Sequence, residues 1–352
     1  SAGLLDVTPL YKYDVTGPDA GGFLARVLVR NVAKMKVGRM TYLCWCDDDG
    51  KVLDDGTCAR LSKDHFRLTS AAPARWWLAR HARPFDVEIA DVTEEIAALA
   101  IQGPTAREVL RGACDADMDA LRFFGVTECD LAGARGWISR TGYTGDLGYE
   151  LWAPKDHALA LWDALMESGR PHGIEPVGLD ALDITRIEAG FILHGVDYVP
   201  ANEALIEDQK SSPFELGLDW RVKFKDRSPP FIGQAALEAE RERGSEWALV
   251  GLDIHWEDIE RMSAEFGLPP SLPAEAWRST VPIYKGSRQV GRATSGVWSP
   301  VLKRYIALAT LEAAAAQTGD ELMIEHMVEW QRRLTPCTVV PTPFFDPPRK
   351  RE

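Results

Sequence analysis

The sequence predicts an α+β protein in which two strand-to-helix units precede a C-terminal β-barrel or sandwich. Residues 15–20 (VTGPDA) recur as residues 101–106 (IQGPTA), and an apolar pair follows each motif three residues later. From about residue 248 onward, short β-type runs alternate with glycine and proline turns. Such runs are typical of an all-β module, whereas the earlier part mixes strand and helix periods.

The repeated Gly-Pro motif predicts how the first two units begin. Glycine permits a turn that other residues resist, and proline at the first helical position gives up an N–H that has no partner there. Each motif therefore predicts a strand that runs directly into a helix. Between the motifs, expected strands at residues 39–46 and 65–70, with a turn at residues 47–50, indicate a β-meander.

The middle of the chain predicts further strands around a glycine-rich loop. Residues 127–139 and 148–152 have strand character, and residues 140–146 (RTGYTGD) have too few apolar anchors to be anything but a loop. Apolar residues at helical spacing then predict amphipathic helices over residues 156–169 and 178–190.

A separate β domain is expected at residues 246–345, with a helical insertion at residues 256–277 and a loose tail at residues 346–352. Five short strands support it, at residues 249–254, 281–284, 289–297, 305–311 and 321–325.

The preceding region, residues 1–245, is expected to hold two intertwined α+β subdomains. One covers about residues 11–95, and the other covers residues 96–200 plus the N-terminal strand. A chain of 352 residues is longer than one hydrophobic core usually serves, which agrees with several domains.

Composition argues against several classes of function. Forty Lys and Arg residues against 53 Asp and Glu residues give a net charge of −13, which disfavours nucleic acid and anionic membranes as partners. No apolar run approaches the roughly 20 residues of a spanning helix, and the opening residues lack a secretory signal. Six cysteines without a C-x-x-C pair indicate reduced thiols and a cytoplasmic protein. No histidines stand at metal-ligand spacing, so no metal is expected.

Pairs of polar residues occur at three places. They are Asp54 with Asp55, Tyr143 with Glu150, and Arg186 with Glu188. Adjacent carboxylates on an extended segment face opposite ways, so one aspartate is expected to serve a pocket and the other to meet solvent. Each pair also has a structural alternative, namely a plain turn, simple loop packing and a buried ion pair, respectively.

In this order and spacing, the motifs resemble one family over almost the whole chain: the folate-dependent aminomethyltransferases and demethylases built like the T-protein of the glycine cleavage system. Besides the two Gly-Pro motifs, the matching segments are residues 5–8 (LDVT), 50–55 (GKVLDD), 140–150 (RTGYTGDLGYE), 186–190 (RIEAG), 231–234 (FIGQ), 294–300 (TSGVWSP) and 306–309 (IALA). The resemblance implies a three-domain clover-leaf fold, with tetrahydrofolate as cofactor in its central opening.

The resemblance also implies roles for four residues. Asp55 falls on the family's essential aspartate, beside the reacting N5–N10 edge of tetrahydrofolate. Glu150 falls on the carboxylate that grips the N–H groups of the pteridine through charge-assisted contacts. Tyr42 and Tyr143 fall on the tyrosines that line the folate. Asp55 is thus the expected catalytic residue, and the other three are expected to bind the cofactor.

Three further residues complete the expected cofactor site. Arg186 falls on an arginine near the cofactor and the substrate opening. Leu10 replaces a methionine that packs on the ring, and Ser70 replaces the asparagine expected at the end of its strand. These replacements, together with an insertion at residues 202–212, depart from the glycine-cleavage pattern and favour a stand-alone demethylase.

The favoured function is therefore a tetrahydrofolate-dependent methyltransferase, a demethylase that moves a methyl group from a small S-, N- or O-methyl donor to N5. One alternative is the aminomethyltransferase of the glycine cleavage system, which produces 5,10-methylenetetrahydrofolate and needs a lipoyl-carrier protein as partner. Another is a non-enzymatic folate-binding protein of the same fold, whose Lys-Gly-Cys-Tyr-type motif is absent from residues 212–217.

Overall fold

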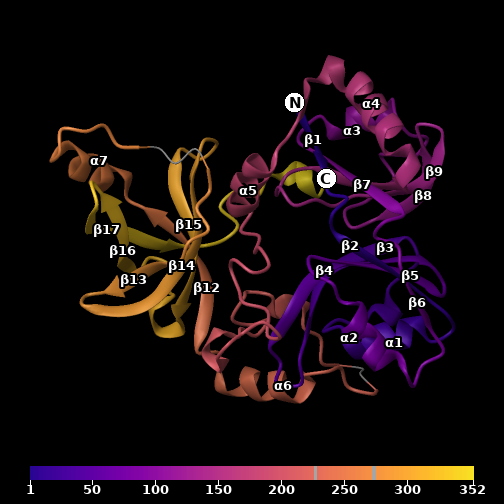
Figure 1. The fold of residues 1–352 in the computed structure, drawn as a ribbon, viewed down its shortest axis with the longest axis horizontal. Coiled ribbons are helices and arrows are strands. Elements are labelled where there is room, and N and C mark those ends of the chain that lie inside the picture. Colours follow the sequence, from indigo (N-terminus) through magenta and orange to yellow (C-terminus); the bar gives the residue numbers. More distant parts are fainter. Residues whose placement is uncertain (226–227, 272–274) are drawn as a thin grey trace. The chain divides into compact units, whose positions relative to one another are not determined.

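The computed structural model describes residues 1–225, 228–271 and 275–352, and their contacts divide the chain into two units. The first unit comprises Ser1–Gly178, Trp220–Leu237 and Pro347–Glu352, and the second comprises Leu179–Asp219 and Glu238–Asp346. The first contains two β-sheets with their helices, and the second contains a closed barrel (Figure 1). Neither unit is a continuous stretch of sequence.

One sheet of the first unit is antiparallel throughout and has the strand order β3-β4-β5-β2-β6. Its strands are β2 (Tyr11–Thr16), β3 (Arg39–Cys46), β4 (Val52–Ser62), β5 (His65–Ser70) and β6 (Glu88–Asp91). Helices α1 (Ala20–Val27) and α2 (Arg75–Ala82) pack against this sheet. Phe23, Leu43 and Phe66 are fully buried in the core between them, where apolar contact drives the packing.

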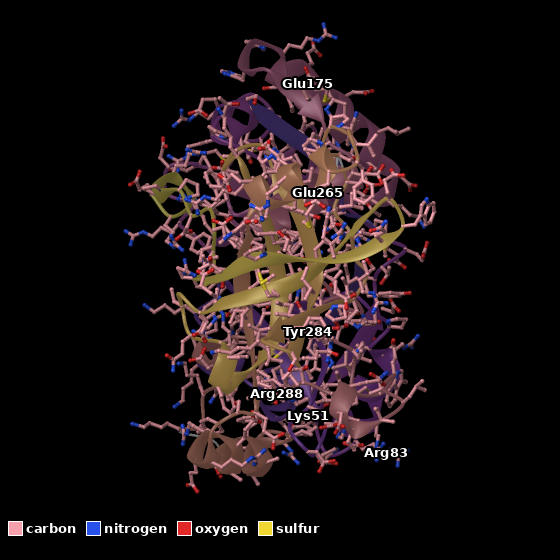
Figure 2. All side chains as sticks on the ribbon, turned by 90° about the vertical axis from the view of Figure 1, so that its left-hand side faces the viewer. Lys51, Arg83, Glu175, Glu265, Tyr284 and Arg288 are labelled. Atoms are coloured by element: carbon pink, nitrogen blue, oxygen red, sulfur yellow. The ribbon has the colours of Figure 1, made fainter. Side chains whose placement is uncertain are left out.

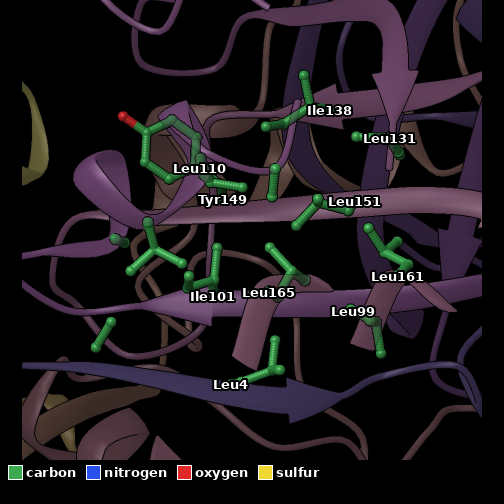
Figure 3. Close-up of a cluster of buried hydrophobic side chains, with 14 of the residues drawn as sticks. Leu4, Leu99, Ile101, Leu110, Leu131, Ile138, Tyr149, Leu151, Leu161 and Leu165 are labelled. Carbon is green, nitrogen blue, oxygen red and sulfur yellow. The ribbon is translucent and has the colours of Figure 1, made fainter. Parts of the chain in front are cut away.

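The other sheet has the order β11-β1-β7-β10-β9-β8, parallel between β1 and β11 and antiparallel elsewhere. Its strands are β1 (Ala2–Asp6), β7 (Ile96–Gln102), β8 (Val126–Leu131), β9 (Ala134–Ser139), β10 (Gly148–Pro154) and β11 (Ile174–Pro176). Helices α3 (Ala106–Arg111) and α4 (Ala158–Gly169) cover its core. Leu99 and Leu151 of the sheet pack there with Leu161 and Leu165 of α4 (Figure 3).

Both Gly-Pro motifs form the predicted strand-to-helix turn. Strand β2 leads into α1 and β7 leads into α3, with Gly17 at φ 121° and Gly103 at φ 122°. A Cβ on Gly17 would lie 2.5 Å from the carbonyl oxygen of Asp86, so both conformation and space require glycine there. The predicted place of the prolines is wrong, because the helix N-caps are the next residues, Asp19 and Thr105. The prolines therefore precede the helices.

The second unit contains the predicted C-terminal barrel, with the closed strand order β12-β15-β14-β13-β16-β17. The strands are β12 (Trp247–Ile254), β13 (Val281–Lys285), β14 (Arg288–Ser299), β15 (Arg304–Glu312), β16 (Glu321–Val328) and β17 (Gln331–Val340). Some polar side chains of the barrel strands form hydrogen bonds or ion pairs with one another. Tyr284, labelled in Figure 2, donates its hydroxyl to Glu325 at 2.7 Å, and Arg288 pairs with Glu312 at 2.6 Å.

Helix α5 (Leu179–Glu188) packs on this barrel through Ile187, which contacts Val297, Ile306 and Leu308. The remaining α-helices of the described residues are α6 (Gln234–Arg243) and α7 (Trp256–Ala264). Short 3₁₀ helices occur at Val32–Lys34, Lys155–His157, Arg170–His172, Glu207–Gln209, Asp219–Arg221, Ala313–Ala315 and Pro348–Lys350. Among the residues that the structure describes, no helix has the length and apolar character needed to span a bilayer.

The strand predictions differ from the structure at several places, and strands β6 and β11 are among those that were not predicted. Strand β4 was not predicted, because Asp54, Asp55 and Gly56 interrupt its apolar alternation. Strand β17 was not predicted either, since it begins with polar residues and contains Pro336. The single strand expected at residues 127–139 is the hairpin β8–β9.

The expected tail and helical insertion also differ. Arg349 Nε donates to Asp146 Oδ1 at 2.7 Å, and Arg107 Nη2 donates to the backbone oxygen of Glu352 at 3.0 Å. The prediction of a loose tail is therefore wrong, because these contacts fix it to the first unit. In the expected insertion, helix α7 ends at Ala264, and residues 272–274 lie outside the described residues.

Candidate active site

The paired aspartates lie on β4, next to the edge strand β3. Cys44 pairs with Asp55 in the strand register, and Tyr42 lies two residues before Cys44 on β3. The Tyr42 hydroxyl donates to Asp55 Oδ2 at 2.8 Å, and both side chains are half-buried. The structure thus brings together two of the residues that the resemblance singled out.

Asp54 faces the other way, as the pleat of the strand requires, but it does not meet solvent. Its side chain is 3% exposed, and its carboxyl accepts the backbone N–H groups of Asp55 at 2.8 Å and Ala72 at 3.1 Å. The expectation that this aspartate is solvated is wrong, because it anchors the chain that follows β5. Burial, followed by the charge of Asp55, raises the pKa of Asp54 to about 8.

Tyr42 is held in its protonated form. Burial raises its pKa well above the usual value, and the charge of Asp55 and the hydrogen bond to it add to the shift. The phenol is therefore a donor to Asp55 throughout the physiological pH range. A donor of this kind orients the Asp55 carboxylate without neutralising it.

Ser70 supports the turn beside this pair. Its hydroxyl donates to the backbone oxygen of Ala72 at 2.8 Å, and the residue is 1% exposed. Ser70 pairs with Gly56 across β4 and β5, one position beyond Asp55. It thus lies near the expected catalytic residue, and its contact with a cofactor stays a prediction.

Gln102, the last residue of β7, holds the loop at residues 140–147 in place through hydrogen bonds. Gln102 Nε2 donates to the carbonyls of Thr141 and Tyr149, each at 3.4 Å, and Gln102 Oε1 accepts the Thr144 hydroxyl at 2.9 Å. The anchor is 5% exposed. Tyr143 of this loop lies close enough to Tyr42 for its charge to raise the pKa of that phenol.

Replacing the anchor is expected to loosen the loop. Gln102→Ala leaves two carbonyls and one hydroxyl without a partner, which should lower the free energy of unfolding by about 2–3 kcal/mol. Urea unfolding measures this loss, and calorimetry should show weaker binding of tetrahydrofolate. Gln289→Ala, the same change at an exposed glutamine, is the control. Equal stability of the two variants would contradict the anchoring role.

Glu150 begins the other side of this loop, on β10, where it pairs with Ala100 and Ser139. The side chain is half-buried, and within the described residues no donor is hydrogen-bonded to its carboxyl. Burial raises the pKa of Glu150 to about 7. A poorly solvated carboxyl that lacks a donor is suited to a ligand that brings N–H groups of its own.

Leu10 lies in the connection between β1 and β2 and is 39% exposed. Sequence reasoning missed Lys12, the residue that holds this connection in place. Lys12 is 1% exposed, and its Nζ donates to the backbone oxygens of Thr8 at 2.8 Å and Leu10 at 2.7 Å. Burial, followed by the charge of Arg67, lowers its pKa to about 8.

Arg186 belongs to the second unit, where a polar network surrounds it. Its Nε donates to Asp183 at 2.6 Å, Nη1 to Asp197 at 2.7 Å and Nη2 to Ser295 at 2.7 Å, and the side chain is 1% exposed. Thr294 and Ser295 also donate to Asp197. The ion-pair alternative is confirmed for Arg186, although its partners are these aspartates. A role toward the folate stays a prediction.

Glu188 has a different partner from Arg186. It accepts the Ser299 hydroxyl at 2.5 Å, and burial raises its pKa. The TSGVWSP segment thus contributes hydroxyls to two acidic groups of the second unit. Among the described residues, no three or more His, Cys, Asp or Glu side chains gather in a way that would hold a metal ion.

Known protein families match nearly the whole chain. The family described as the GCVT N-terminal domain matches residues 1–226, and the glycine cleavage T-protein C-terminal barrel domain matches residues 266–346. The structure is similar to the crystal structure of the glycine cleavage system aminomethyltransferase T from Bartonella henselae. The TM-score is 0.81 at 26% identity, over 98% of this chain and 86% of that one. The T-protein-like α+β fold is thereby confirmed.

Three curated relatives carry two different names. An aminomethyltransferase of Geobacillus thermodenitrificans is 35% identical over 98% of this chain and 87% of that protein. A trimethylamine-oxide aldolase of Ruegeria pomeroyi is 33% identical over 99% of this chain, which spans 42% of that longer protein. An aminomethyltransferase of Bacillus subtilis is 32% identical over 98% of this chain and 88% of that protein.

Proposed function

Because the chain belongs to the glycine-cleavage T-protein family and is a one-carbon transferase that uses tetrahydrofolate, we propose that it takes its one-carbon unit from an amine nitrogen. The proposed product is 5,10-methylenetetrahydrofolate. The names of the relatives support this choice, since aminomethyl groups and trimethylamine oxide both carry the carbon on nitrogen. Donors with a methyl group on sulfur or on an aryl ether have no such support.

The observation that carries the proposal is the Tyr42–Asp55 pair. Tyr42 stays protonated and fixes the orientation of the Asp55 carboxylate through a bond of 2.8 Å. In a half-buried site, a carboxylate held in this way stabilises positive charge on a nearby amine and can accept a proton from it. Tetrahydrofolate, when bound, supplies the nitrogen that accepts the carbon.

Glu150 fits the task of holding the pteridine. Its carboxyl is half-buried and lacks a hydrogen-bond donor among the described residues, so the N–H groups of a pterin would supply what the chain does not. Tyr143, on the loop that precedes Glu150, would line the same ring. Once the ring is fixed, the orientation of the reacting atoms and the stabilisation of charge on the amine are the main contributions of the protein to the rate of transfer.

The sequence favoured a stand-alone demethylase, and Ser70 was one of the reasons. Since the Ser70 hydroxyl donates its hydrogen to Ala72, it has no donor left for a ligand, and this replacement carries little weight for that choice. Under the proposed function the donor is either an aminomethyl group on a lipoyl-carrier protein or the N-oxide of a small methylamine, whose N–O bond supplies the oxidation from methyl to methylene. The first of these requires the carrier as a partner.

Identifying the folate product tests the proposal. The protein is incubated with tetrahydrofolate and one donor at a time. The donors are an aminomethylated lipoyl carrier, trimethylamine N-oxide, a sulfonium compound and an aryl methyl ether. We expect 5,10-methylenetetrahydrofolate from a nitrogen-bound donor. Formation of 5-methyltetrahydrofolate from the sulfonium or the ether would instead establish the demethylase function.

Tetrahydrofolate binding is expected to strengthen between pH 6 and pH 8. Below the raised pKa of about 7, Glu150 is increasingly a neutral acid, which cannot accept two N–H donors as a carboxylate does. Affinity should therefore fall toward a limit of about tenfold per pH unit below pH 7, and it should level off above pH 8. Calorimetry across this range measures the effect. An identical pH profile for Glu150→Gln would contradict the assignment.

A further inference from the structure

Arg221 is a buried cation beside the candidate active site. Its side chain is 6% exposed, and sequence reasoning missed it because it belongs to no recognisable motif. Its guanidinium carbon lies 3.4 Å from the centre of the Trp220 ring and 6.0 Å from that of the Tyr42 ring. Tyr42 is the residue that donates to Asp55. The guanidinium therefore lies beside the ring of Tyr42, whose hydroxyl is bonded to Asp55.

No carboxylate pairs with this guanidinium within the described residues. Nη1 donates to Thr41 Oγ1 at 3.2 Å, whereas Nε is shielded from water and has no hydrogen-bond partner among the residues that the structure describes. Burial, followed by the charge of Arg30, lowers the pKa of Arg221 to about 10, so the group remains charged at neutral pH. Buried charges are normally paired, because desolvation otherwise goes uncompensated.

Aromatic contacts compensate for only part of this loss. The rings of Trp220 and Phe124 attract the cation but accept no directed N–H bond from its edge. In any arginine, Nε and Nη2 form an edge with two parallel donors that match the oxygens of a carboxylate. Arg30 makes no ion pair among the described residues and adds a second positive charge to the same place.

We propose that Arg221, supported by the charge of Arg30, binds a carboxylate group of the ligand that occupies the Tyr42–Asp55 site. The inference rests on the proposed function, which supplies two ligands that can carry such a group. One source is the glutamate moiety of tetrahydrofolate. The other is a carboxylate on the one-carbon donor, as in the N-oxide of an N,N-dimethylated amino acid.

Calorimetry with tetrahydrofolate and with tetrahydropteroate, which lacks the glutamate, tests the first source. We expect the wild-type protein to bind tetrahydrofolate about 10- to 100-fold more tightly than tetrahydropteroate. In Arg221→Met this advantage should disappear, while the affinity for tetrahydropteroate stays within about threefold. Arg83→Met, the same change at an exposed arginine (Figure 2), should retain the advantage.

The second source gives a different pattern. N-Methylglycine, which carries a carboxylate, and dimethylamine, which does not, are the amines left when such N-oxides lose their one-carbon unit. Each is titrated into the complex with tetrahydrofolate. If the donor carries the carboxylate, N-methylglycine should bind about 10- to 100-fold more weakly to Arg221→Met, while folate and dimethylamine binding are unchanged. A folded Arg221→Met variant that binds all four compounds as the wild type does would overturn the proposal.

Thermal unfolding checks that each variant is folded. If Arg221→Met is not, Arg221→Lys replaces it, since lysine keeps the charge but lacks the edge with two donors, and it should still lose about tenfold of the carboxylate-dependent affinity. If the wild type binds no reduced folate, the proposed function and this inference fail together. If the wild type binds it and the variants are indifferent to the carboxylate, this inference alone fails.

Discussion

Asp55→Asn is expected to reduce kcat by about 10²- to 10³-fold while tetrahydrofolate still binds within about threefold of the wild-type affinity. The amide keeps the size of the side chain and can still accept the Tyr42 hydroxyl, so the architecture of the pair survives. What disappears is the negative charge beside the amine and the capacity to accept its proton. Steady-state kinetics, with the folate Kd from calorimetry, separates these two effects.

Asp49→Asn makes the same chemical change at an exposed aspartate in the turn before β4. This control should have normal turnover, since nothing links its charge to the site. If Asp55→Asn also turns over normally, Asp55 is not the catalytic residue. If it loses folate binding in proportion to activity, its role is in binding instead.

Asp197→Ala is expected to cause the largest loss of stability, about 3–5 kcal/mol in the second unit. The Asp197 carboxyl accepts four hydrogen bonds. The donors are Nη1 of Arg186, the backbone N–H of Leu193, and the hydroxyls of Thr294 and Ser295. Without this carboxyl, the guanidinium of Arg186 loses one of its negative partners. It is 1% exposed, so water cannot take the place of that partner. Urea unfolding followed by fluorescence measures the loss.

Thr294→Val provides the matched control for this network. It removes one hydroxyl donor from Asp197 but leaves both charges paired, so it should cost only about 1 kcal/mol. A similar cost for the two variants would mean that the buried charge of Arg186 is not what makes Asp197 necessary.

The parts of the site that follow from local sequence could be predicted. The Tyr42–Asp55 pairing lies within one hairpin, and the glycine-rich loop connects Tyr143 to Glu150 over seven residues. The resemblance named these residues one by one, whereas the bond between Tyr42 and Asp55 was not predicted, because strand β4 was not. The strand-to-helix turns were predictable, since Gly17 and Gly103 meet a local conformational need.

The contributions that were missed depend on contacts between distant segments. Arg221 lies 180 positions from its partner Thr41, and nothing in the intervening sequence marks their approach. An aspartate is usually exposed to solvent, so the sequence alone does not indicate that Asp54 is buried. In the structure, the backbone N–H of Ala72, which follows β5, donates a hydrogen bond to its carboxyl. Burial of this kind depends on the packed fold, and no periodicity in the sequence predicts it.

The bond between Arg349 and Asp146 has a consequence for biosynthesis. The two residues are 203 positions apart, and a ribosome that adds about 5–20 residues per second needs roughly 10–40 s to travel between them. During that interval the nascent loop at residues 140–147 lacks this contact. The loop can therefore reach its final arrangement only after residue 349 has been added to the chain.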